Sequence, residues 1–315
     1  MEQVTIRGER WFPSERNFAE EMASCWGNWY CDSEVGTLRA VLMHRPGPEV
    51  DAVTDPAAVR FKALMDPERA RAQHDALAEV YRSHGVEVHY VEGGRLDRPN
   101  ALFMRDQVLM TPQGAIVCRP AMEARRGEER FAAEALARLG VPIVKTISGE
   151  GIFEGACLLW LDSETVIVGT GSRANASGVA QVERELRDQG VTTFLPFQIP
   201  YGHAHLDGIM NVADRKTVMI FPWQVPYDVC RPLLDRGFTL VENPHVEEVK
   251  QTFGVNFVAL APGKVVMPAG NPRTRELLEG AGVTCIEVDL SEIIKGWGAV
   301  HCMTAFLRRD PVLPS

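Results

Sequence analysis

Cys302, near the C-terminus, lies where a cysteine could act as a nucleophile. It follows a loop in which Gly296 and Gly298 let the backbone approach a ligand closely. A cysteine in such a loop becomes a reactive thiolate where a cation or an imidazolium lies nearby, and otherwise it is a buried structural residue. The choice between these two interpretations depends on the residues that accompany the thiol.

An imidazole beside a carboxylate is the first candidate partner for this thiol. His205 and Asp207 are separated by one residue, so their side chains point to the same side of an extended chain. Such a pair can donate and accept protons near neutral pH. His203 lies two residues earlier, so its side chain points to the same side, and it is the local alternative to His205. The other alternative is that His205 has a purely structural role, with its hydrogen bonds made inside the fold.

Two further acidic residues, Asp106 and Glu154, begin otherwise apolar hairpins. Burying carboxylates is costly without a partner, and several of them in one pocket would suit a planar guanidinium. The alternative is an internal ion pair of Asp106 with Arg105 or Arg125. Arg125 and Arg173 are themselves candidates for binding a substrate carboxylate, against the alternative that both are solvated.

Composition excludes several classes of function. The chain has 315 residues, of which 45% are hydrophobic and 24% charged, and its formal net charge is -9. A net negative charge argues against non-specific binding of nucleic acid, which needs a basic surface, and it is compatible with a small cationic substrate. No apolar run approaches the ~20 residues of a membrane-spanning helix. The polar N-terminus has no signal-peptide pattern, so a cytoplasmic location is expected.

Sequence motifs typical of disulfide-rich, zinc-binding and nucleotide-binding proteins are absent. The seven cysteines are scattered and contain no CxxC pair, which predicts reduced thiols rather than disulfides or a zinc site. Neither a P-loop, nor GxGxxG after a strand, nor HExxH occurs. We therefore predict a reaction that needs no cofactor and no metal.

The elements that must position these residues repeat along the chain. Apolar hairpins start at residues 108, 158, 209 and 257, at intervals of 50, 51 and 48 residues. Each hairpin is followed by a charged, helical stretch and then by a short strand. A near-constant period with a constant order of elements indicates a repeat architecture, in which the units pack on one another.

The two ends of the chain complete a fifth unit. Residues 37–46 form a strand that lacks a hairpin partner, and the strand near residue 305 lacks a helix. Pairing of the N- and C-terminal strands predicts a closed five-bladed α/β propeller of pseudo-symmetric hairpin–helix–strand repeats. We expect one domain over 1–315, with 1–36 as an N-terminal extension and repeats from about 37 to 310. A doubly wound α/β sheet is the alternative, which the hairpins weaken.

Four clusters and this repeat together resemble the guanidine-modifying superfamily, which includes arginine deiminases, dimethylargininases, agmatine deiminases and amidinotransferases. The clusters are PNALFMRD (99–106), FEGA (153–156), HAHLDG (203–208) and GWGAVHC (296–302). The resemblance runs from about residue 37 to 310, and it implies the five-bladed α/β propeller. It also implies that Cys302 is the nucleophile and His205 the catalytic histidine. Asp106, Asp207 and Glu154 would hold the guanidinium, and Glu154 would orient the histidine.

The resemblance also assigns residues to the amino-acid end of the substrate. Asn100 and Arg105 would help to bind this end, and Arg125 and Arg173 resemble arginines that bind the α-carboxylate in arginine deiminases. Two features depart from the family pattern. Ala156-Cys157 replaces the usual Gly-Asp after the acidic element, and the bulky Trp297 stands in the loop before the nucleophile, where it could close over the substrate.

Two enzymatic outcomes and one non-catalytic interpretation remain open. A hydrolase of the deiminase or dihydrolase type, acting on L-arginine or a close derivative, is favoured by Glu154 and by the two arginine elements. An amidinotransferase, which needs an acceptor amine, is favoured by His301 directly before Cys302. Asp207 disfavours dimethylarginine, because a carboxylate there prefers unsubstituted nitrogens. A non-catalytic propeller, as in a ribosome anti-association factor, is disfavoured by the complete set of reactive residues.

Overall fold

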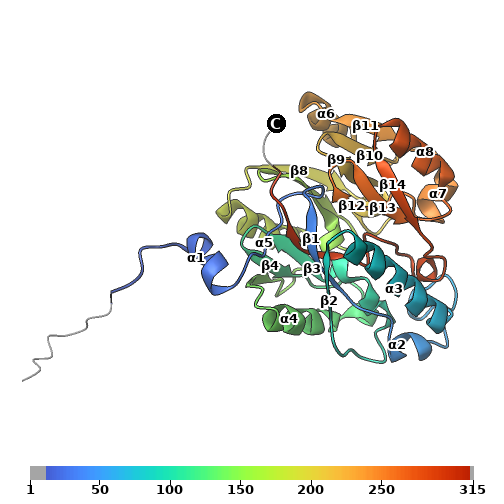
Figure 1. Ribbon diagram of the computed structural model, residues 1–315, viewed down its shortest axis with the longest axis horizontal. Helices are drawn as coiled ribbons and strands as arrows, with labels where there is room; N and C mark the ends of the chain where they lie inside the picture. The colour runs from blue at the N-terminus through green and yellow to red at the C-terminus, as the bar shows by residue number, and fades with distance from the viewer. Residues whose placement is uncertain (1–11, 313–315) are drawn as a thin grey trace, which may run out of the picture.

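The computed structural model describes residues 12–312, and its strands form five separate three-stranded sheets (Figure 1). Each sheet combines an antiparallel strand pair with a third strand that runs parallel to the middle one. The sheets are β15-β1-β2, β3-β4-β5, β6-β7-β8, β9-β10-β11 and β12-β13-β14. The strands are β1 (Leu38–Met43), β2 (Glu87–Tyr90), β3 (Val108–Thr111), β4 (Gly114–Val117), β5 (Ile143–Thr146), β6 (Leu158–Asp162), β7 (Thr165–Thr170), β8 (Thr193–Gln198), β9 (Met210–Asp214), β10 (Thr217–Ile220), β11 (Thr239–Glu242), β12 (Val258–Ala261), β13 (Lys264–Pro268), β14 (Thr284–Val288) and β15 (Ala305–Arg309).

Helices connect the middle strand of each sheet to its parallel neighbour, as such a crossover requires. The long helix α3, for example, begins after its cap Asp66, and its buried residues include Ala70, Leu77 and Tyr81, which share one face. The α-helices are α1 (Phe18–Cys25), α2 (Pro48–Asp51), α3 (Pro67–Ser83), α4 (Glu128–Arg138), α5 (Ala176–Asp188), α6 (Tyr227–Asp235), α7 (Val246–Lys250) and α8 (Pro272–Gly280). Short 3-10 turns are η1 (Pro99–Leu102), η2 (Met104–Asp106), η3 (Glu123–Arg125), η4 (Gly155–Cys157), η5 (Leu206–Gly208) and η6 (Ile293–Gly296).

The first sheet is assembled from both ends of the chain. β1 pairs antiparallel with β15, and β2 runs parallel to β1 on its other side. The predicted pairing of the terminal strands is therefore confirmed. The predicted repeat is confirmed as well, with β3, β6, β9 and β12 beginning at residues 108, 158, 210 and 258. Gly114, the first residue of β4, and Gly263, in the turn between β12 and β13, both have positive φ, which glycine adopts without strain.

Side chains, rather than a continuous ladder of strands, connect neighbouring sheets. The Trp160 indole on β6 donates a hydrogen bond of 3.2 Å to the carbonyl of Met110 on β3. The Arg309 guanidinium on β15 likewise donates one of 2.8 Å to the carbonyl of Ala259 on β12. Within residues 12–312 the fold is therefore α/β with five small open sheets. It contains neither one closed barrel nor the single doubly wound sheet of the alternative prediction.

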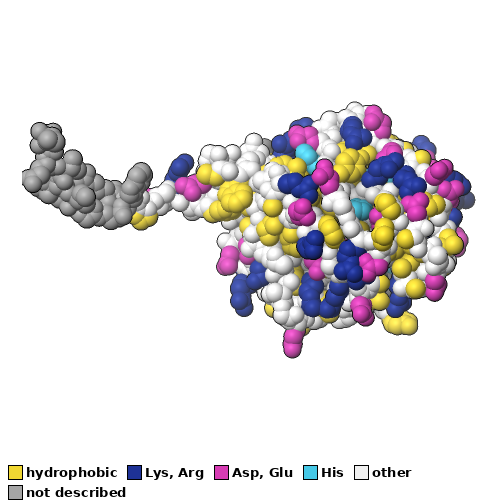
Figure 2. Space-filling model, turned by 90° about the horizontal axis from the view of Figure 1, so that it is seen from below, with side chains coloured by type: hydrophobic (Ala, Val, Ile, Leu, Met, Phe, Trp, Pro, Cys, Tyr) yellow, Lys and Arg dark blue, Asp and Glu magenta, His cyan; other side chains and the backbone are white. Residues whose placement is uncertain are grey.

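The surface carries charges of both signs. Lysine and arginine side chains are interspersed with aspartate and glutamate on the face shown in Figure 2. None of the helices in the described part of the chain is long and apolar enough to cross a membrane.

Candidate active site

The predicted reactive residues lie just before the first strand of their sheets. Asp106 precedes β3, Glu154 precedes β6, His205 and Asp207 precede β9, and Cys302 precedes β15. Each leading segment contains a tight turn, and three of these turns are the 3-10 turns η2, η4 and η5. In four of the five sheets the repeat thus places one or two of the predicted side chains at the same stage of the unit.

The turns that carry Asp106 and Glu154 are in close contact. A Cβ atom on Gly155 would lie 2.4 Å from the carbonyl oxygen of Arg105 and 3.0 Å from that of Val108. Only a glycine permits this approach, because both obstacles are backbone atoms that cannot rotate away. Gly155 therefore brings the two carboxylates together.

Asp106, Glu154 and His205 form a buried acid–imidazole cluster. The His205 Nε2 atom lies 2.6 Å from Oε2 of Glu154 and 3.5 Å from Oδ1 of Asp106. The other oxygen of Glu154 accepts a hydrogen bond of 2.8 Å from the backbone N–H of Ala121, which fixes the carboxylate. The structure thus brings three of the predicted residues together, with a hydrogen bond between His205 and Glu154 and with Asp106 beside them.

The charges in this cluster determine its protonation state. Burial alone lowers the pKa of His205, but Asp106 and Glu154 outweigh burial and raise this pKa to about 9. Burial raises the pKa of Glu154, but the hydrogen bond and charge of His205 outweigh it and lower that pKa to about 2. The pKa of Asp106 is raised, mainly by burial. At neutral pH the group is thus an imidazolium held by a carboxylate.

A metal ion does not fit this cluster, although its three ligand atoms lie within 4.8 Å of one another. The Arg125 guanidinium already contacts Asp106, with Nη1 2.5 Å from Oδ2, and lies 3.9 Å from Oε2 of Glu154. A cation bound there would face this guanidinium and the His205 imidazolium. These two neighbouring cations disfavour a metal ion in the cluster, and a site without metal stays a prediction.

Cys302 lies beside a carboxylate and an amide. Its thiol Sγ is 3.5 Å from Oδ2 of Asp207 and accepts a hydrogen bond of 3.2 Å from Nδ2 of Asn256. The amide oxygen of Asn256 in turn accepts from the backbone N–H groups of His301 and Cys302. Burial, with the charges of Asp207 and Asp106, raises the pKa of the Cys302 thiol well above its usual range. The unliganded thiol is therefore protonated at neutral pH.

Asn256 and Glu34 were missed by the sequence analysis. Asn256 precedes β12 just as Asp106 precedes β3, so the repeat itself carried the signal that could have found it. Glu34 lies in the predicted N-terminal extension, where no local pattern marks it. Its buried carboxylate contacts His301, with Oε2 3.2 Å from Nε2, and His301 contacts Asp207.

The arginines near the site differ in their surroundings. Arg105 is 1% exposed, and its guanidinium donates to Glu34 at 2.8 Å and to the Leu158 carbonyl at 3.0 Å. These contacts are internal, so they lend no support to a role of Arg105 in binding substrate. Arg125 pairs with Asp106 and, at 2.9 Å, with Glu128, which is the internal ion pair considered as an alternative above.

Asn100, Arg173 and His203 complete the set of predicted residues. The Asn100 side chain donates to the carbonyl of Val59, and the backbone carbonyl of Asn100 accepts from Arg125. Arg173 lies at the edge of the cluster, with Nε 3.9 Å from Glu154. His203 packs near the Phe221 ring, with ring centroids 6.3 Å apart, so the imidazole that meets the carboxylates is that of His205.

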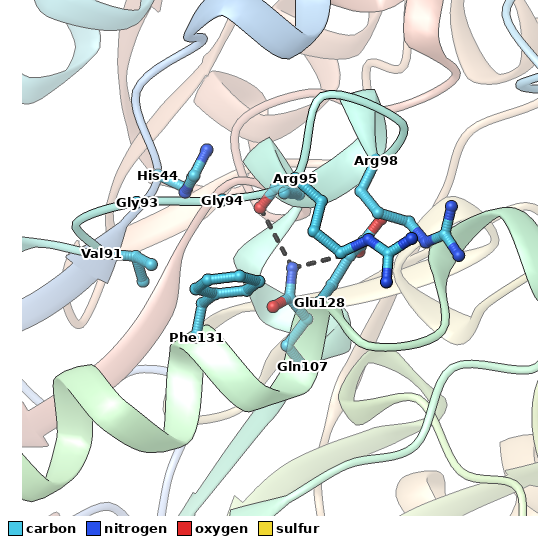
Figure 3. A pocket seen from close by; sticks show the side chains of 10 residues that line it. His44, Val91, Gly93, Gly94, Arg95, Arg98, Gln107, Glu128 and Phe131 are labelled. Carbon is cyan, nitrogen blue, oxygen red and sulfur yellow. Dashed lines mark hydrogen bonds between the residues drawn. The ribbon is translucent and has the colours of Figure 1, made fainter.

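Glu128 connects the site to a small neighbouring cavity (Figure 3). The Gln107 amide donates to Glu128 at 3.3 Å, and His44, Arg95, Arg98 and Phe131 also line the space. Burial raises the pKa of Glu128 to about 8, against the opposing effect of Arg125. Glu128, the partner of Arg125, lines the cavity, whereas none of the nine predicted site residues does.

The two departures from the family pattern have different surroundings. Cys157 is buried, and burial raises the pKa of its thiol well above the usual range, so it is an inert neighbour of Glu154. Trp297 is half exposed, and Lys62 lies over its ring at 4.2 Å from Nζ to the centroid. It also adopts a left-handed backbone conformation, with a φ of 66°, which is unusual for a non-glycine residue.

Comparison with known proteins places the chain in a family. The family model for eukaryotic N,N dimethylarginine dimethylhydrolase matches residues 56–309. The N(G),N(G)-dimethylarginine dimethylaminohydrolase of Streptomyces coelicolor is 29% identical over 271 residues, which cover 86% of this chain and 97% of the relative.

Solved structures support the same relationship. A Cys-to-Ser variant of the dimethylarginine dimethylaminohydrolase of Pseudomonas aeruginosa, complexed with citrulline, superposes with a TM-score of 0.71 and 25% identity. The match covers 86% of this chain and 100% of that one. SxtG, an amidinotransferase from Microseira wollei, shares the fold with a TM-score of 0.73 and 15% identity, over 91% of this chain and 99% of its own. The chain therefore belongs to the N,N-dimethylarginine dimethylhydrolase family, within the superfamily of amidinotransferases and arginine deiminases.

Proposed function

We propose that this protein is a cysteine-dependent hydrolase that cleaves a C–N bond at the guanidinium carbon of L-arginine or a close derivative. The observation that carries the proposal is that three buried carboxylates lie near one imidazole and one thiol: Asp106 and Glu154 contact His205, and Asp207 contacts Cys302, whose pKa both aspartates raise. Oδ1 of Asp106 is buried without a hydrogen-bond partner, which leaves an acceptor for a cationic ligand. A planar guanidinium, with several N–H donors and a permanent charge, matches such a set of acceptors.

The first chemical step forms a bond between sulfur and the guanidinium carbon. The positive charge of the substrate offsets the carboxylates that disfavour ionisation of Cys302, so binding promotes the thiolate, and the thiol proton passes to solvent because His205 is already protonated. The thiolate attacks the carbon to give a tetrahedral adduct. His205, charged in the free protein, donates its proton to the departing nitrogen, and the C–N bond breaks. A thiouronium group remains on Cys302.

The second step returns the enzyme to its starting state. Neutral His205 now accepts a proton from water, and the resulting hydroxide adds to the thiouronium carbon. Collapse of this adduct breaks the C–S bond, and the hydroxyl proton of the adduct passes to the departing sulfur, which restores the Cys302 thiol. The released ammonia takes up the proton that the thiol gave to solvent in the first step. When ammonia is the departing amine, the balance is one guanidinium and one water converted to one ureido product and one ammonium ion.

Arg173 and Arg125 are the proposed partners of the amino-acid end. Arg173 Nε is buried without a hydrogen-bond partner within residues 12–312, so it can donate to a carboxylate. Arg125 is bound to Asp106 and Glu128. It can bind a substrate carboxylate only while it keeps these two partners or after it gives one of them up. A free α-amino acid is for this reason the proposed class of substrate.

An amidinotransferase is the second candidate, and the His301-Cys302 pair is the feature that favours it. In that reaction the amine chain of the substrate leaves, and an acceptor amine takes water's place. We rank hydrolysis first because the hydrolase relatives reach 29% identity, whereas the amidinotransferase structure, at 15%, supports the fold alone.

We further propose that the five sheets are the blades of one α/β propeller domain. The support is the sheet assembled from both chain ends and the side-chain contacts between neighbouring sheets. Such an arrangement would place the five segments that carry the reactive residues around a common centre. A cytoplasmic location is part of the same proposal.

Mass spectrometry of the products tests the proposed function. Incubation with L-arginine should yield citrulline or ornithine with ammonia in the absence of any acceptor amine, and Cys302→Ala should lower the rate at least ~1,000-fold. Parallel incubations with N,N-dimethylarginine and with glycine or lysine as acceptors separate the alternatives. Ornithine formed only with an acceptor would establish a transferase, and turnover of dimethylarginine alone would reverse the preference assigned to Asp207.

A further inference from the structure

Behind Cys302 lies a row of buried groups whose charges alternate. Oδ2 of Asp207, the atom nearest to the thiol, lies 2.8 Å from Nδ1 of His301. On the other side of the ring, Nε2 of His301 lies 3.2 Å from Oε2 of Glu34. The second oxygen of Glu34 accepts a hydrogen bond of 2.8 Å from Arg105. The four side chains are almost completely buried, each being 1% or 2% exposed.

The geometry requires an imidazolium in the middle of this row. Both nitrogens of His301 face carboxylate oxygens, so both can donate only when the ring is doubly protonated. Burial opposes this charge, but the hydrogen bonds to Asp207 and Glu34 outweigh burial and raise the pKa of His301. The charged groups that face the ring are Asp207 from η5 and Glu34 from the N-terminal segment, with Arg105 of η2 beyond Glu34.

The row also determines which oxygen of Asp207 is free. Both hydrogen bonds that the Asp207 carboxylate makes within residues 12–312 use Oδ2. Oδ1 is thereby left for a ligand, at a carboxylate whose orientation is fixed from behind.

We propose that His301 is a positioning residue that, braced by Glu34, holds Asp207 beside Cys302 and offsets the negative charge of Asp207 next to the thiol. This inference rests on the proposed function in so far as Asp207 binds the substrate guanidinium. It goes beyond that function by giving the N-terminal segment and the residue before the nucleophile a part in catalysis. The His301 imidazolium affects the Cys302 thiol only through Asp207. Loss of the imidazolium should therefore let the Asp207 carboxylate move and should raise the pKa of Cys302 further.

The first test measures the thiol itself and needs no turnover. The rate of Cys302 alkylation by iodoacetamide, followed on the Cys302 peptide by mass spectrometry at pH 8, should fall about tenfold in His301→Gln. At that pH Asp207 is still a carboxylate, so its charge is then uncompensated. Glu34→Gln should also slow the alkylation of Cys302, by a smaller factor. If His301→Gln does not fold, Glu34→Gln alone tests the proposal.

The second test measures catalysis. With the substrate identified by product analysis, His301→Gln should lower kcat ~10- to 100-fold, with a smaller change in KM. Because both residues act through Asp207, the double variant with Glu34→Gln should lose little more than His301→Gln alone. His74→Gln removes another fully buried imidazole, on α3, and is the matched control for lost packing.

The outcomes separate the inference from the proposed function. A slower alkylation in His301→Gln supports the positioning role even if no guanidine tested is turned over, which would contradict the proposed function only. Unchanged alkylation and kcat in a folded His301→Gln protein would overturn the inference. So would losses of the same size in His74→Gln, because they would show that any buried imidazole matters equally.

Discussion

At the scale of single residues, the site consists of buried groups of opposite charge that keep one another ionised. His205 stays protonated because Asp106 and Glu154 surround it, and Glu154 stays ionised because His205 and Arg125 are near. Arg125 competes with the substrate for one of these carboxylates. Its guanidinium occupies Asp106 in the unliganded protein, so a substrate guanidinium must share this carboxylate or displace Arg125.

The raised pKa of His205 predicts a stability that depends on pH. A histidine whose pKa rises from about 6.5 unfolded to about 9 folded stabilises the native state fully below pH 6.5, and this contribution disappears as the pH rises through 9. His205→Gln should therefore lose up to about 3 kcal/mol relative to wild type at pH 6, and clearly less at pH 9.5. Urea unfolding at both pH values measures the difference, with His203→Gln as the control. A difference independent of pH would mean that His205 is neutral in the folded protein.

At the scale of elements, turns rather than strands set the distances between reactive groups. η2 and η4 touch through Gly155, and this contact lets Glu154 and Asp106 approach the same nitrogen of His205, at 2.6 Å and 3.5 Å. Gly208, in the equivalent turn η5, has open space where a Cβ would lie. The chain thus offers two glycines in similar turns, only one of which is sterically required.

Gly155→Ala should damage the site while Gly208→Ala should not. The new methyl group would overlap the Arg105 carbonyl, so η4 must move, at a cost of about 1–3 kcal/mol. A displacement of the order of 1 Å in Glu154 should lower kcat/KM ~100-fold. Steady-state kinetics and thermal unfolding of both variants check the expectation. Equal effects of the two alanines would show that helical propensity, not the close approach, matters here.

At the scale of the whole molecule, the two ends of the chain are joined in one sheet. The backbone of Tyr30 bonds to Leu307 and Arg309 beside β15, and Cys31, Ser33 and Glu34 are buried. Residues 30–36 therefore pack within the body rather than extending from it. The helix α1 that precedes them stands apart from the sheets in Figure 1.

Two truncations should distinguish these parts. A protein starting at Gly27, which lacks α1, should keep its melting temperature within a few degrees and retain its activity. One starting at Gly36 loses Glu34 and leaves Arg105 and His301 as buried cations without it, at a cost of about 3–5 kcal/mol. Its melting temperature should fall by about 10 °C, as measured by calorimetry. Equal stability of both truncations would mean that residues 27–35 contribute little to the fold.

The sequence by itself determined the repeat and the choice of candidate residues. Hairpin, helix and strand signals are local, so their period was visible, and the pairing of the terminal strands followed from counting units. Cys302, His205, Asp207, Asp106 and Glu154 could be selected because their clusters stand near the same stage of each unit and resemble the motifs of a known superfamily.

Only the tertiary structure decided how these residues are supported. Asn256 meets Cys302 across 46 residues, and Glu34 meets His301 across 267. The choice of Arg125 rather than Arg105 as the partner of Asp106 depended on side-chain directions within neighbouring turns. Contacts of this kind join distant segments that the packing of the sheets brings together, and no period or local pattern along the chain encodes them.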